Sequence, residues 1–135
     1  MTKESTRETI IRTHFAADPY IASQGFILHE VLDDELSVAA IVRPDQANFQ
    51  GGTHGGVVFS LADCAFSLSC NAYSESAVAI DTHMVYTAPS KVGDRLVATA
   101  TEVTRGRTLG SYRVTVTRPD GRAVGLFTGT ALVLD

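Results

Sequence analysis

The amino-acid sequence predicts an α+β domain in which an antiparallel sheet packs against one long helix. Residues 55–73 carry a single charged side chain, Asp63, and such a run is typical of a helix that is buried on most sides. The C-terminal half is rich in Val, Thr, Leu and Tyr, which favour strands. Short turns join these predicted strands, so neighbouring strands are expected to run antiparallel.

The size and charge of the chain limit its class. Its 135 residues suit a single domain over residues 1–135, with residues 1–18 as an N-terminal helical extension. Hydrophobic residues make up 44% of the chain and the formal net charge is −4, which argues against a disordered or nucleic-acid-binding protein. The first residues carry both charges and no apolar stretch, so we expect no signal peptide, and no apolar run is long enough to predict a membrane-spanning helix. We therefore expect a cytoplasmic protein without a membrane partner.

The two cysteines, Cys64 and Cys70, are predicted to be buried, reduced thiols. They lie on the same predicted helix, where six residues separate them by about 9 Å along the axis and turn them to different faces. A disulfide between them is excluded by this geometry. Reduced cysteines agree with a cytoplasmic location.

The N-terminal third is predicted to contain one helix and two strands. Apolar residues at helical spacing, Ile10, Ile11 and Phe15, favour an amphipathic helix that ends at Asp18-Pro19. Alternating apolar and polar residues then indicate strands. In chain order, the expected elements are a helix over residues 3–17, strands over residues 24–32 and 36–43, and a Gly-rich loop over residues 46–52.

The long helix is predicted over residues 55–73, and four strands follow it. Asp120-Gly121 indicates a type I′ turn between the last two strands. One side of the helix is expected to pack on the sheet. Its other side is also mostly apolar and needs a further partner, which a second subunit would supply. The four strands are expected over residues 77–88, 94–104, 108–118 and 122–134.

A short motif at the start of this helix holds chemically useful residue types. Gly55 and Gly56 stand at the predicted N-terminus, where free N–H groups and the helix dipole favour an oxyanion. Asp63 is a lone carboxylate in an apolar helix, a costly placement that chemistry can require. An oxyanion-binding helix start together with a carboxylate indicates an acyl-transfer site.

Each residue of this motif also has a purely structural interpretation. Asp63 is a candidate structural acid, and Gly55-Gly56 could provide only clearance for packing. His54 would then cap the helix, and Asn48 would order its loop. Other kinds of site are not indicated, because the sequence lacks a G-x-S-x-G motif, a P-loop motif and histidines at metal-ligand spacing. We therefore expect no metal.

The motif as a whole resembles the hotdog-fold acyl-CoA thioesterases of the phenylacetate-degradation type. Asn48, His54, Gly55 and Asp63 have the spacing of that family. The resemblance implies an antiparallel sheet wrapped around one long central helix, and hydrolysis of an acyl-CoA thioester to free acid and coenzyme A. It also implies a homo-oligomer, either a dimer or a homotetramer built from two dimers. The similarity continues in residues 78–89, 92–98 and 126–130.

The resemblance further implies a role for each residue of the motif. Asp63 acts as the general base on water or attacks the thioester directly. The Gly55 N–H polarises the thioester carbonyl. Asn48 and His54 hold that carbonyl or the leaving thiolate.

The strand after the helix leaves two questions open. Some relatives carry a water-orienting Ser or Thr where this chain has Ala79, so Asp81 or Ser67 is expected to hold the water here. Asp81 and His83 also keep open a hotdog enoyl-CoA hydratase, whose chemistry needs an Asp and a His that converge. A non-catalytic acyl-CoA-binding protein is a further alternative, although a sensor needs an output domain that this sequence does not indicate.

The acyl group is predicted to be aromatic, such as phenylacetyl or a hydroxylated variant, or else of medium chain length. Phe59 and Phe66 share a helical stripe with the carboxylate and suit either group. Arg105 and Arg107 flank Gly106 in a turn that would present two guanidinium forks to a coenzyme A phosphate, unless they are only solvated turn charges. The predicted substrate-binding residues are Gly56, Phe59, Phe66, Ser67, Lys91, Arg105, Gly106 and Arg107, and no cofactor is expected beyond the coenzyme A of the substrate.

Helix geometry predicts that one chain cannot complete this site. Gly55 and Asp63 are eight residues apart, which is about 12 Å along one helix. A reacting carbonyl needs its oxyanion donor and its base each within about 3 Å. We therefore expect Gly55 and Asn48 of one subunit to meet Asp63 of its two-fold mate at a dimer interface.

Overall fold

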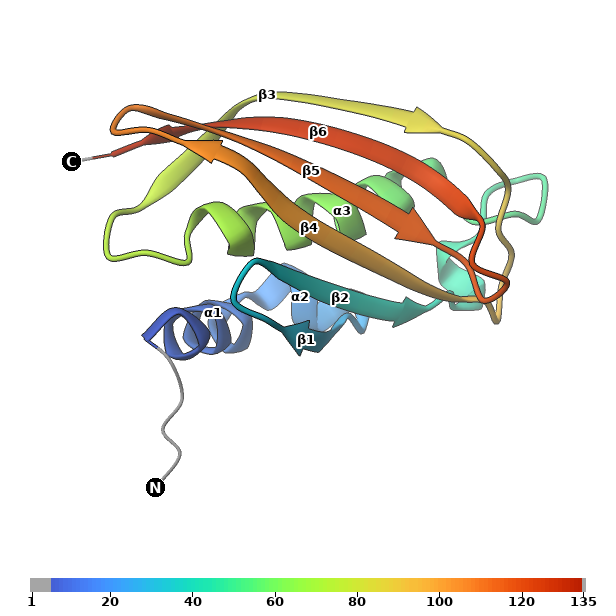
Figure 1. Cartoon of the computed structure of the whole chain (residues 1–135). Coiled ribbons are helices and arrows are strands. Elements are labelled where there is room, and N and C mark those ends of the chain that lie inside the picture. Colours follow the sequence, from blue (N-terminus) through green and yellow to red (C-terminus); the bar gives the residue numbers. More distant parts are fainter. Residues whose placement is uncertain (1–5, 135) are drawn as a thin grey trace.

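The structure, a computed structural model, describes residues 6–134 and has the predicted α+β composition (Figure 1). The helix start predicted at residues 3–5 lies outside the described residues. The helices are α1 (Thr6–Ala17), α2 (Pro19–Gln24), the 3₁₀ helix η1 (Pro44–Gln46) and α3 (Gly55–Cys70). The strands are β1 (Ile27–Val31), β2 (Glu35–Ile41), β3 (Ala77–Tyr86), β4 (Arg95–Arg105), β5 (Leu109–Thr117) and β6 (Ala123–Val133).

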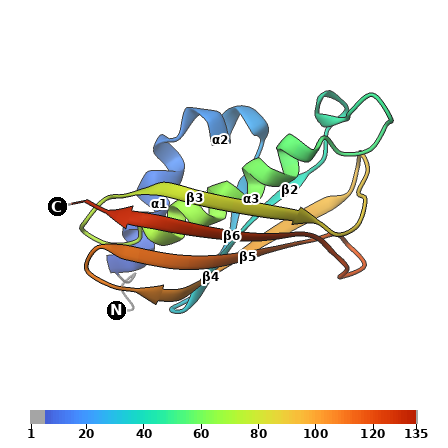
Figure 2. The ribbon, with the colours of Figure 1, turned by 90° about the horizontal axis from the view of Figure 1, so that it is seen from above.

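The six strands form one antiparallel sheet in the order β1-β2-β4-β5-β6-β3. The sheet curves around α3, and Leu61 and Phe66 of α3 are buried in the core together with Phe127 of β6. Helices α1 and α2 lie on the side of α3 that the sheet leaves open (Figures 1 and 2). The expected hotdog architecture is confirmed. Part of the helix surface that was predicted to need a partner is covered by the chain's own N-terminal helices.

Helix α3 begins at Gly55, as predicted, and ends three residues earlier than the sequence indicated. Its N-cap is His54, whose ring Nδ1 accepts the N–H of Gly56 at 3.0 Å. At the other end, the side chain of Asn71 accepts the N–H of Ala77 at 2.8 Å and donates to its carbonyl at 3.1 Å. These bonds turn the chain into β3, and they depend on tertiary contacts that a hydropathy pattern does not contain.

Helix α2 corrects the prediction that the chain after Asp18-Pro19 leads directly into a strand. Asp18 is an N-cap whose carboxylate accepts the N–H of Tyr20 at 3.0 Å, and Pro19 occupies the first turn. Gly25 ends the helix with φ +74°, the left-handed conformation that favours glycine at this position. Asp-Pro therefore starts a second helix as well as ending the first, because proline suits the first turn of a helix.

The turn between β5 and β6 corrects the type I′ prediction. The Arg118 N–H donates to the Arg122 carbonyl at 3.0 Å, which leaves residues 119–121 as a three-residue loop. Gly121 has φ +86°, whereas no described non-glycine residue, Asp120 included, has a positive φ. A type I′ turn needs positive φ at both central residues. Pro119 fixes a negative φ at the start of the loop and so selects the longer turn with glycine in the left-handed position.

Strand β3 lies at one edge of the sheet. It pairs with β6 and, within the described residues, with no strand on its other side. Val78, Ile80 and Val85 are apolar side chains on this strand that remain 45–55% exposed. An open strand edge with exposed apolar side chains is a surface that proteins normally cover.

Candidate active site

A pocket of about 590 Å³ opens beside the N-terminus of α3. The loop before the helix, the end of β3 and the segment that follows β3 form its walls. We call it the Asn48 pocket. The lining residues used below are Asn48, Gly52, Gly55 and Tyr86.

Gly55 contributes a free backbone donor to the Asn48 pocket. The Gly56 N–H is bonded to His54, and the N–H groups of Val57 and Val58 donate to the His54 carbonyl at 2.9 and 3.4 Å. Within residues 6–134, the Gly55 N–H has no acceptor. The start of α3 therefore offers one uncapped N–H, at the positive end of the helix dipole, to a negative oxygen. This corrects the expectation for Gly56, whose N–H is not free.

His54 is oriented by the cap that it makes. Because its Nδ1 accepts a hydrogen bond, a neutral His54 carries its proton on Nε2. The side chain is exposed and does not line the Asn48 pocket of its own chain. The structural interpretation of His54 as a helix cap is correct, and its Nε2–H is also left as a donor.

Asn48 contributes a second donor to the same pocket. Its Oδ1 accepts the backbone N–H groups of Gln50 at 2.9 Å and Gly52 at 3.1 Å. These bonds identify the oxygen of the amide and leave Nδ2 as a donor without an acceptor in the described chain. Asn48 and Gly55 thus bring two free N–H donors to one pocket, which is the composition of an oxyanion hole.

Asp63 lines a separate pocket of about 480 Å³ between α3 and the N-terminal helices. Phe59, Ser60 and Ser67 of α3 line it beside Asp63, and Ala17 and Tyr20 line it from the α1–α2 side. We call it the Asp63 pocket. It shares no lining residue with the Asn48 pocket, as the helix geometry predicts for two groups about 12 Å apart.

The Asp63 carboxylate is partly buried and has no hydrogen-bond or ion-pair partner within residues 6–134. Ser60 cannot donate to it, because the Ser60 hydroxyl donates to the Gly56 carbonyl at 2.8 Å. Burial raises the pKa of Asp63 above its usual value, since desolvation disfavours the charged form. An unpaired carboxylate with a raised pKa in a pocket is typical of a reactive group rather than a structural acid.

Phe66 is a core residue and not a pocket residue, which corrects the prediction that it contacts substrate. It is 1% exposed, and its ring packs against Tyr112 and Phe127 with centroid distances of 5.6 and 5.5 Å. Phe59, on the same helix, does line the Asp63 pocket. One phenylalanine of this helical stripe therefore lines the pocket and the other packs in the core. Only the tertiary packing determines which residue has which role.

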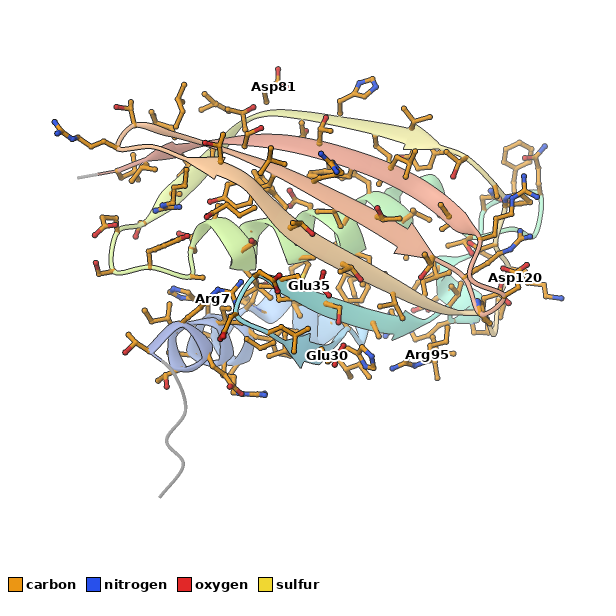
Figure 3. The ribbon with its side chains drawn as sticks, in the orientation of Figure 1. Arg7, Glu30, Glu35, Asp81, Arg95 and Asp120 are labelled. Carbon is orange, nitrogen blue, oxygen red and sulfur yellow. The ribbon has the colours of Figure 1, made fainter. Side chains whose placement is uncertain are left out.

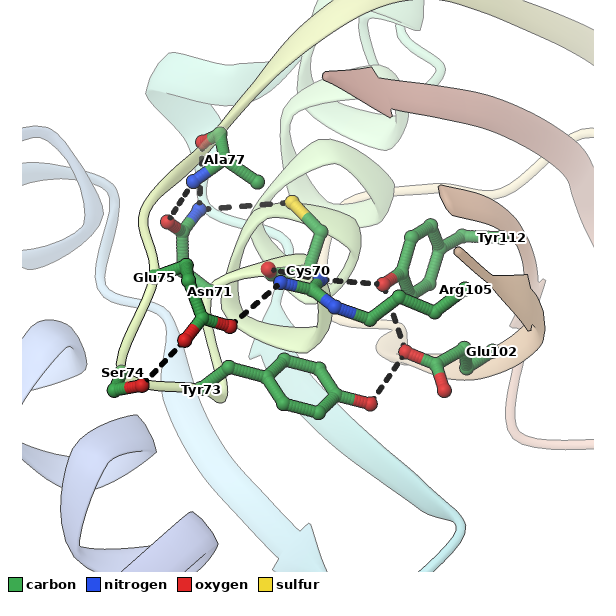
Figure 4. A network of polar contacts seen from close by, with 9 residues as sticks. All are labelled: Cys70, Asn71, Tyr73, Ser74, Glu75, Ala77, Glu102, Arg105 and Tyr112. Carbon is green, nitrogen blue, oxygen red and sulfur yellow. Dashed lines mark hydrogen bonds and ion pairs between the residues drawn. The ribbon is translucent and has the colours of Figure 1, made fainter. Parts of the chain in front are cut away.

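Arg105 also differs from its prediction. Its guanidinium Nη1 donates to the Cys70 carbonyl at 2.9 Å and to the Tyr112 hydroxyl at 3.1 Å, and the group lies 3.8 Å from the ring centre of Tyr73 (Figure 4). The side chain is 10% exposed. A buried cation at the carboxyl end of α3 complements the helix dipole. Arg105 thus anchors α3 to the sheet and does not form a pair of phosphate-binding forks with the exposed Arg107.

The remaining phosphate-binding candidates are exposed. Arg107 and Gly106 lie in the turn between β4 and β5. Lys91 forms an isolated β-bridge with Gly52, which places its backbone beside the Asn48 loop. The coenzyme A roles of Lys91, Gly106 and Arg107 stay predictions.

Ser67 and Asp81, the two residues predicted to hold the attacking water, lie in different parts of the structure. Ser67 lines the Asp63 pocket, one helical turn after Asp63. Asp81 is exposed on β3 and points away from α3 (Figure 3). His83 is also exposed on β3, and neither residue lines the Asp63 pocket. Within one chain, Ser67 is therefore the better placed of the two water-holding candidates.

Two tyrosines near the pockets were not predicted. Tyr86, at the end of β3, donates from its hydroxyl to the Gly55 carbonyl at 3.2 Å. Tyr20 of α2 bonds to the Ser60 hydroxyl at 2.8 Å. Both come from elements far from the motif in sequence, so only the fold brings them to it. The two cysteines are free and buried, as predicted.

Comparison with known proteins identifies the family. Residues 50–124 match the model of the Thioesterase superfamily. The chain belongs to this superfamily. The acyl-coenzyme A thioesterase PaaI of Escherichia coli (strain K12) is 33% identical over 99 residues, which are 73% of this chain and 71% of that protein. The predicted family is confirmed, and with it the class of enzyme, a thioester hydrolase.

Solved structures of thioesterase superfamily members have the same fold. The E. coli PaaI protein from the phenylacetic acid degradation operon matches with a TM-score of 0.92, at 26% identity over 96% of this chain and 94% of that one. A mutant of the phenylacetic acid degradation protein PaaI from Thermus thermophilus matches with a TM-score of 0.83, at 38% identity over 87% and 100%. A hypothetical thioesterase from Streptococcus pneumoniae with coenzyme A matches with a TM-score of 0.75, at 27% identity over 80% and 87%.

None of the helices within residues 6–134 has the length and apolar character that crossing a membrane requires.

Proposed function

We propose that this chain hydrolyses acyl-CoA thioesters to a carboxylic acid and coenzyme A, at a site completed by two copies of the chain. The proposal rests on one observation: the hydrogen-bond donors and the carboxylate that the reaction needs lie in two separate pockets of one chain. Two free N–H donors, from Gly55 and Asn48, share one pocket, and the unpaired carboxylate of Asp63 lies in another. The acyl-CoA class is supported by the name of E. coli PaaI and by the coenzyme A in the S. pneumoniae structure.

In the proposed reaction, the thioester carbonyl oxygen accepts hydrogen bonds from Gly55 and Asn48 of one copy. These donors stabilise the negative charge that develops when the carbonyl carbon becomes tetrahedral. The partner's Asp63, in its ionised form, removes a proton from an attacking water or attacks the carbonyl carbon itself. The C–S bond then breaks and coenzyme A leaves as the thiolate. Water supplies the second oxygen of the acid in either case.

A second copy is the proposed partner because β3 has an open edge. Two copies of one strand can pair across a two-fold axis, which makes the same contacts twice. The exposed apolar residues Val78, Ile80 and Val85 would be covered in this way. The same two-fold would place Asp63 of each copy opposite Gly55 of the other and so form two equivalent sites. A homotetramer of two such dimers belongs to the proposal as its extension.

The proposed acyl group is aromatic, with phenylacetyl and its hydroxylated variants first and medium-chain groups second. Phe59 in the Asp63 pocket gives an aromatic or alkyl group an apolar contact. The proposed reaction uses no metal and no cofactor beyond the coenzyme A of the substrate. The proposed location is the cytoplasm, because Cys64 and Cys70 are free and reduced thiols persist there.

The test is a panel of phenylacetyl-, 4-hydroxyphenylacetyl-, benzoyl-, octanoyl- and enoyl-CoA, with detection of free thiol and identification of the products. Thiol release with formation of the carboxylic acid is the expected outcome. Formation of a hydroxyacyl-CoA without thiol would instead identify a hydratase. Binding of acyl-CoA without any product would identify a binding protein, and either result would overturn the proposal.

A further inference from the structure

The Asp63 pocket has a wall that the motif did not predict. Helices α1 and α2 meet beside α3, and residues 17–21 from this junction line the pocket together with Phe59 and Leu68 of α3. The Asp18 carboxylate accepts the backbone N–H groups of Tyr20 and Ile21. We call residues 17–21 the α1–α2 elbow. The elbow and α3 thus enclose the space next to the carboxylate that the proposed reaction uses.

The pocket has an apolar floor and a polar rim. Ile21, Cys64 and Leu68 are each no more than 5% exposed, so their side chains form its inner surface. His14, Ser67 and Asn71 lie at partly or fully exposed positions around it. A volume of about 480 Å³ is within the range of small-molecule pockets, which have mostly apolar linings and a few polar groups.

The elbow is fixed to α3 by a hydrogen bond whose direction follows from the contacts. The Ser60 hydroxyl donates its proton to the Gly56 carbonyl at 2.8 Å. The 2.8 Å contact between the Tyr20 and Ser60 hydroxyls must therefore be donated by Tyr20. Asp18 holds the turn of α2 that carries Tyr20. A wall that is held by a side-chain bond and an N-cap keeps a defined spacing from α3.

The position of the carboxylate determines what can occupy this space. The thioester carbonyl carbon must lie within about 3 Å of Asp63 or of the water that it activates. The first atoms of the acyl group are bonded to that carbon and therefore lie beside Asp63. The sulfur of coenzyme A is bonded to the same carbon, so the character of the pocket decides which end of the substrate enters it. Coenzyme A is large, polar and charged, and does not suit a pocket with a buried apolar floor. An apolar acyl group does suit it.

We propose that the α1–α2 elbow forms the acyl-binding wall of the site, and that Ala17 and Tyr20 determine which acyl groups fit. This inference rests on the proposed function, because it assigns the acyl end of the same substrate. The elbow sets the width of the pocket, and the Tyr20–Ser60 bond keeps that width constant. Acyl groups with an apolar body of aryl or medium-chain size fill it, and an acetyl group does not reach the elbow.

Two neighbouring alanines offer a matched test. Ala16 and Ala17 are both exposed near the end of α1, and only Ala17 lines the pocket. Ala17→Phe fills the pocket, and Ala16→Phe places the same ring outside it. We expect Ala17→Phe to lower kcat/KM for phenylacetyl- and octanoyl-CoA by at least about 10-fold, the scale on which a pocket distinguishes small changes in size. Ala16→Phe should match the wild type, and the inhibition constant of free coenzyme A should be unchanged in both.

Tyr20→Phe gives a second, milder variant that keeps the ring and removes the bond to Ser60. It should change the ratio of kcat/KM between phenylacetyl- and octanoyl-CoA while the inhibition constant of free coenzyme A stays constant. Two outcomes would overturn the elbow assignment and leave the thioesterase proposal intact. In the first, Ala17→Phe and Ala16→Phe have equal kcat/KM values for acyl-CoA. In the second, Ala17→Phe loses acyl-CoA turnover and coenzyme A binding in parallel. A wild type that releases no thiol from any acyl-CoA would overturn both.

Discussion

The hydroxyl of Tyr86 donates a hydrogen bond to the carbonyl of Gly55 across 3.2 Å, and so ties the end of β3 to the first residue of α3. The same ring covers the α-carbon of Gly55, since a Cβ built there would lie 3.5 Å from it. The N–H of Gly55 is the uncapped donor of the Asn48 pocket. Tyr86 is therefore a positioning residue for the group that is proposed to polarise the substrate carbonyl.

Replacing Tyr86 with Phe should lower kcat and leave KM for acyl-CoA nearly unchanged. The lost hydrogen bond is worth about 0.5–1.5 kcal/mol, which corresponds to roughly 2- to 10-fold in rate if it acts only on the donor geometry. Tyr73→Phe is the matched control, because that hydroxyl bonds to Glu102 at 2.7 Å and does not line the Asn48 pocket. Steady-state kinetics of both variants check this, and identical kcat values for Tyr86→Phe and the wild type would contradict it.

The parts of the site that the sequence predicted are those determined locally. Gly55 and Asp63 are proposed from a helix start and a lone carboxylate in an apolar run, both of which are visible in one dimension. Asn48 is proposed from the family resemblance. His54 was assigned two possible roles, and its capping bond is also a local contact.

The parts that could not be predicted depend on side-chain direction in three dimensions. Phe66 and Phe59 share a helical stripe, yet the sheet buries the first and the elbow leaves the second in a pocket. The sequence predicts Arg105 in an exposed turn, but it is the last residue of β4 and its guanidinium donates to the carboxyl end of α3. Tyr20 and Tyr86 reach the pockets from distant elements. Helix α2 has readable signals, an Asp-Pro start and a glycine end. Asp18-Pro19 also fits the end of α1, and that interpretation alone hides the second helix.

Asp63→Asn should reduce turnover by roughly 10²–10⁴, the usual scale for losing a positioned acid–base group. The amide has nearly the same shape as the carboxyl group, so the variant should fold. Circular dichroism and thiol-release assays on the same preparation check both statements. A folded variant with nearly wild-type rate would show that Asp63 is a structural acid after all.

The same substitution should also affect how stability depends on pH. Burial raises the pKa of Asp63 in the folded chain above its unfolded value. At low pH the Asp63 carboxyl group is protonated in both the folded and the unfolded chain, and its contribution to the free energy of unfolding is fully present. That contribution is lost as pH rises through the pKa of the folded state, because ionising the buried group is unfavourable. Asp63→Asn avoids this loss. We therefore expect the Tm of the variant, relative to the wild type, to increase between pH 4 and pH 7.

A control substitution isolates the effect of burial. Asp34→Asn removes an exposed carboxylate in the β1–β2 turn, and its Tm difference from the wild type should change less over the same pH range. Thermal melts of the three proteins at both pH values make the comparison. A Tm difference for Asp63→Asn that falls with rising pH would have the wrong sign for a buried acid.

Arg105→Ala should affect stability, whereas Arg107→Ala should affect substrate binding. Arg105→Ala removes hydrogen bonds from a charged group to the Cys70 carbonyl at the end of α3 and to the Tyr112 hydroxyl of β5, and should lower the free energy of unfolding by about 1.5–3 kcal/mol. Arg107→Ala removes an exposed side chain and should change it by less than about 0.5 kcal/mol. If Arg107 binds a coenzyme A phosphate, its loss raises KM for acyl-CoA but much less for acyl-pantetheine, which lacks the nucleotide phosphates. Urea unfolding and kinetics with both substrates distinguish these roles, and equal stability of the two variants would contradict the anchoring role of Arg105.

Complementation between two inactive variants tests whether the site is shared. Asp63→Asn removes the carboxylate from one pocket, and Asn48→Ala removes a donor from the other. The two pockets share no lining residue, so each variant keeps one half of the site intact. Unfolding and refolding an equal mixture makes about half of the dimers mixed, and each mixed dimer has one intact site of two. Activity should therefore recover to ~25% of wild type from this two-fold symmetry.

The comparison that decides this prediction is between the refolded mixture and the two variants refolded separately. Separately refolded proteins should remain inactive, because every site in them lacks the same group. Heterodimers can be verified by a tag on one chain before the assay. If verified heterodimers have no activity, each site is built within a single chain. A carbonyl would then have to reach Gly55 and Asp63 of the same helix, although they lie about 12 Å apart along its axis.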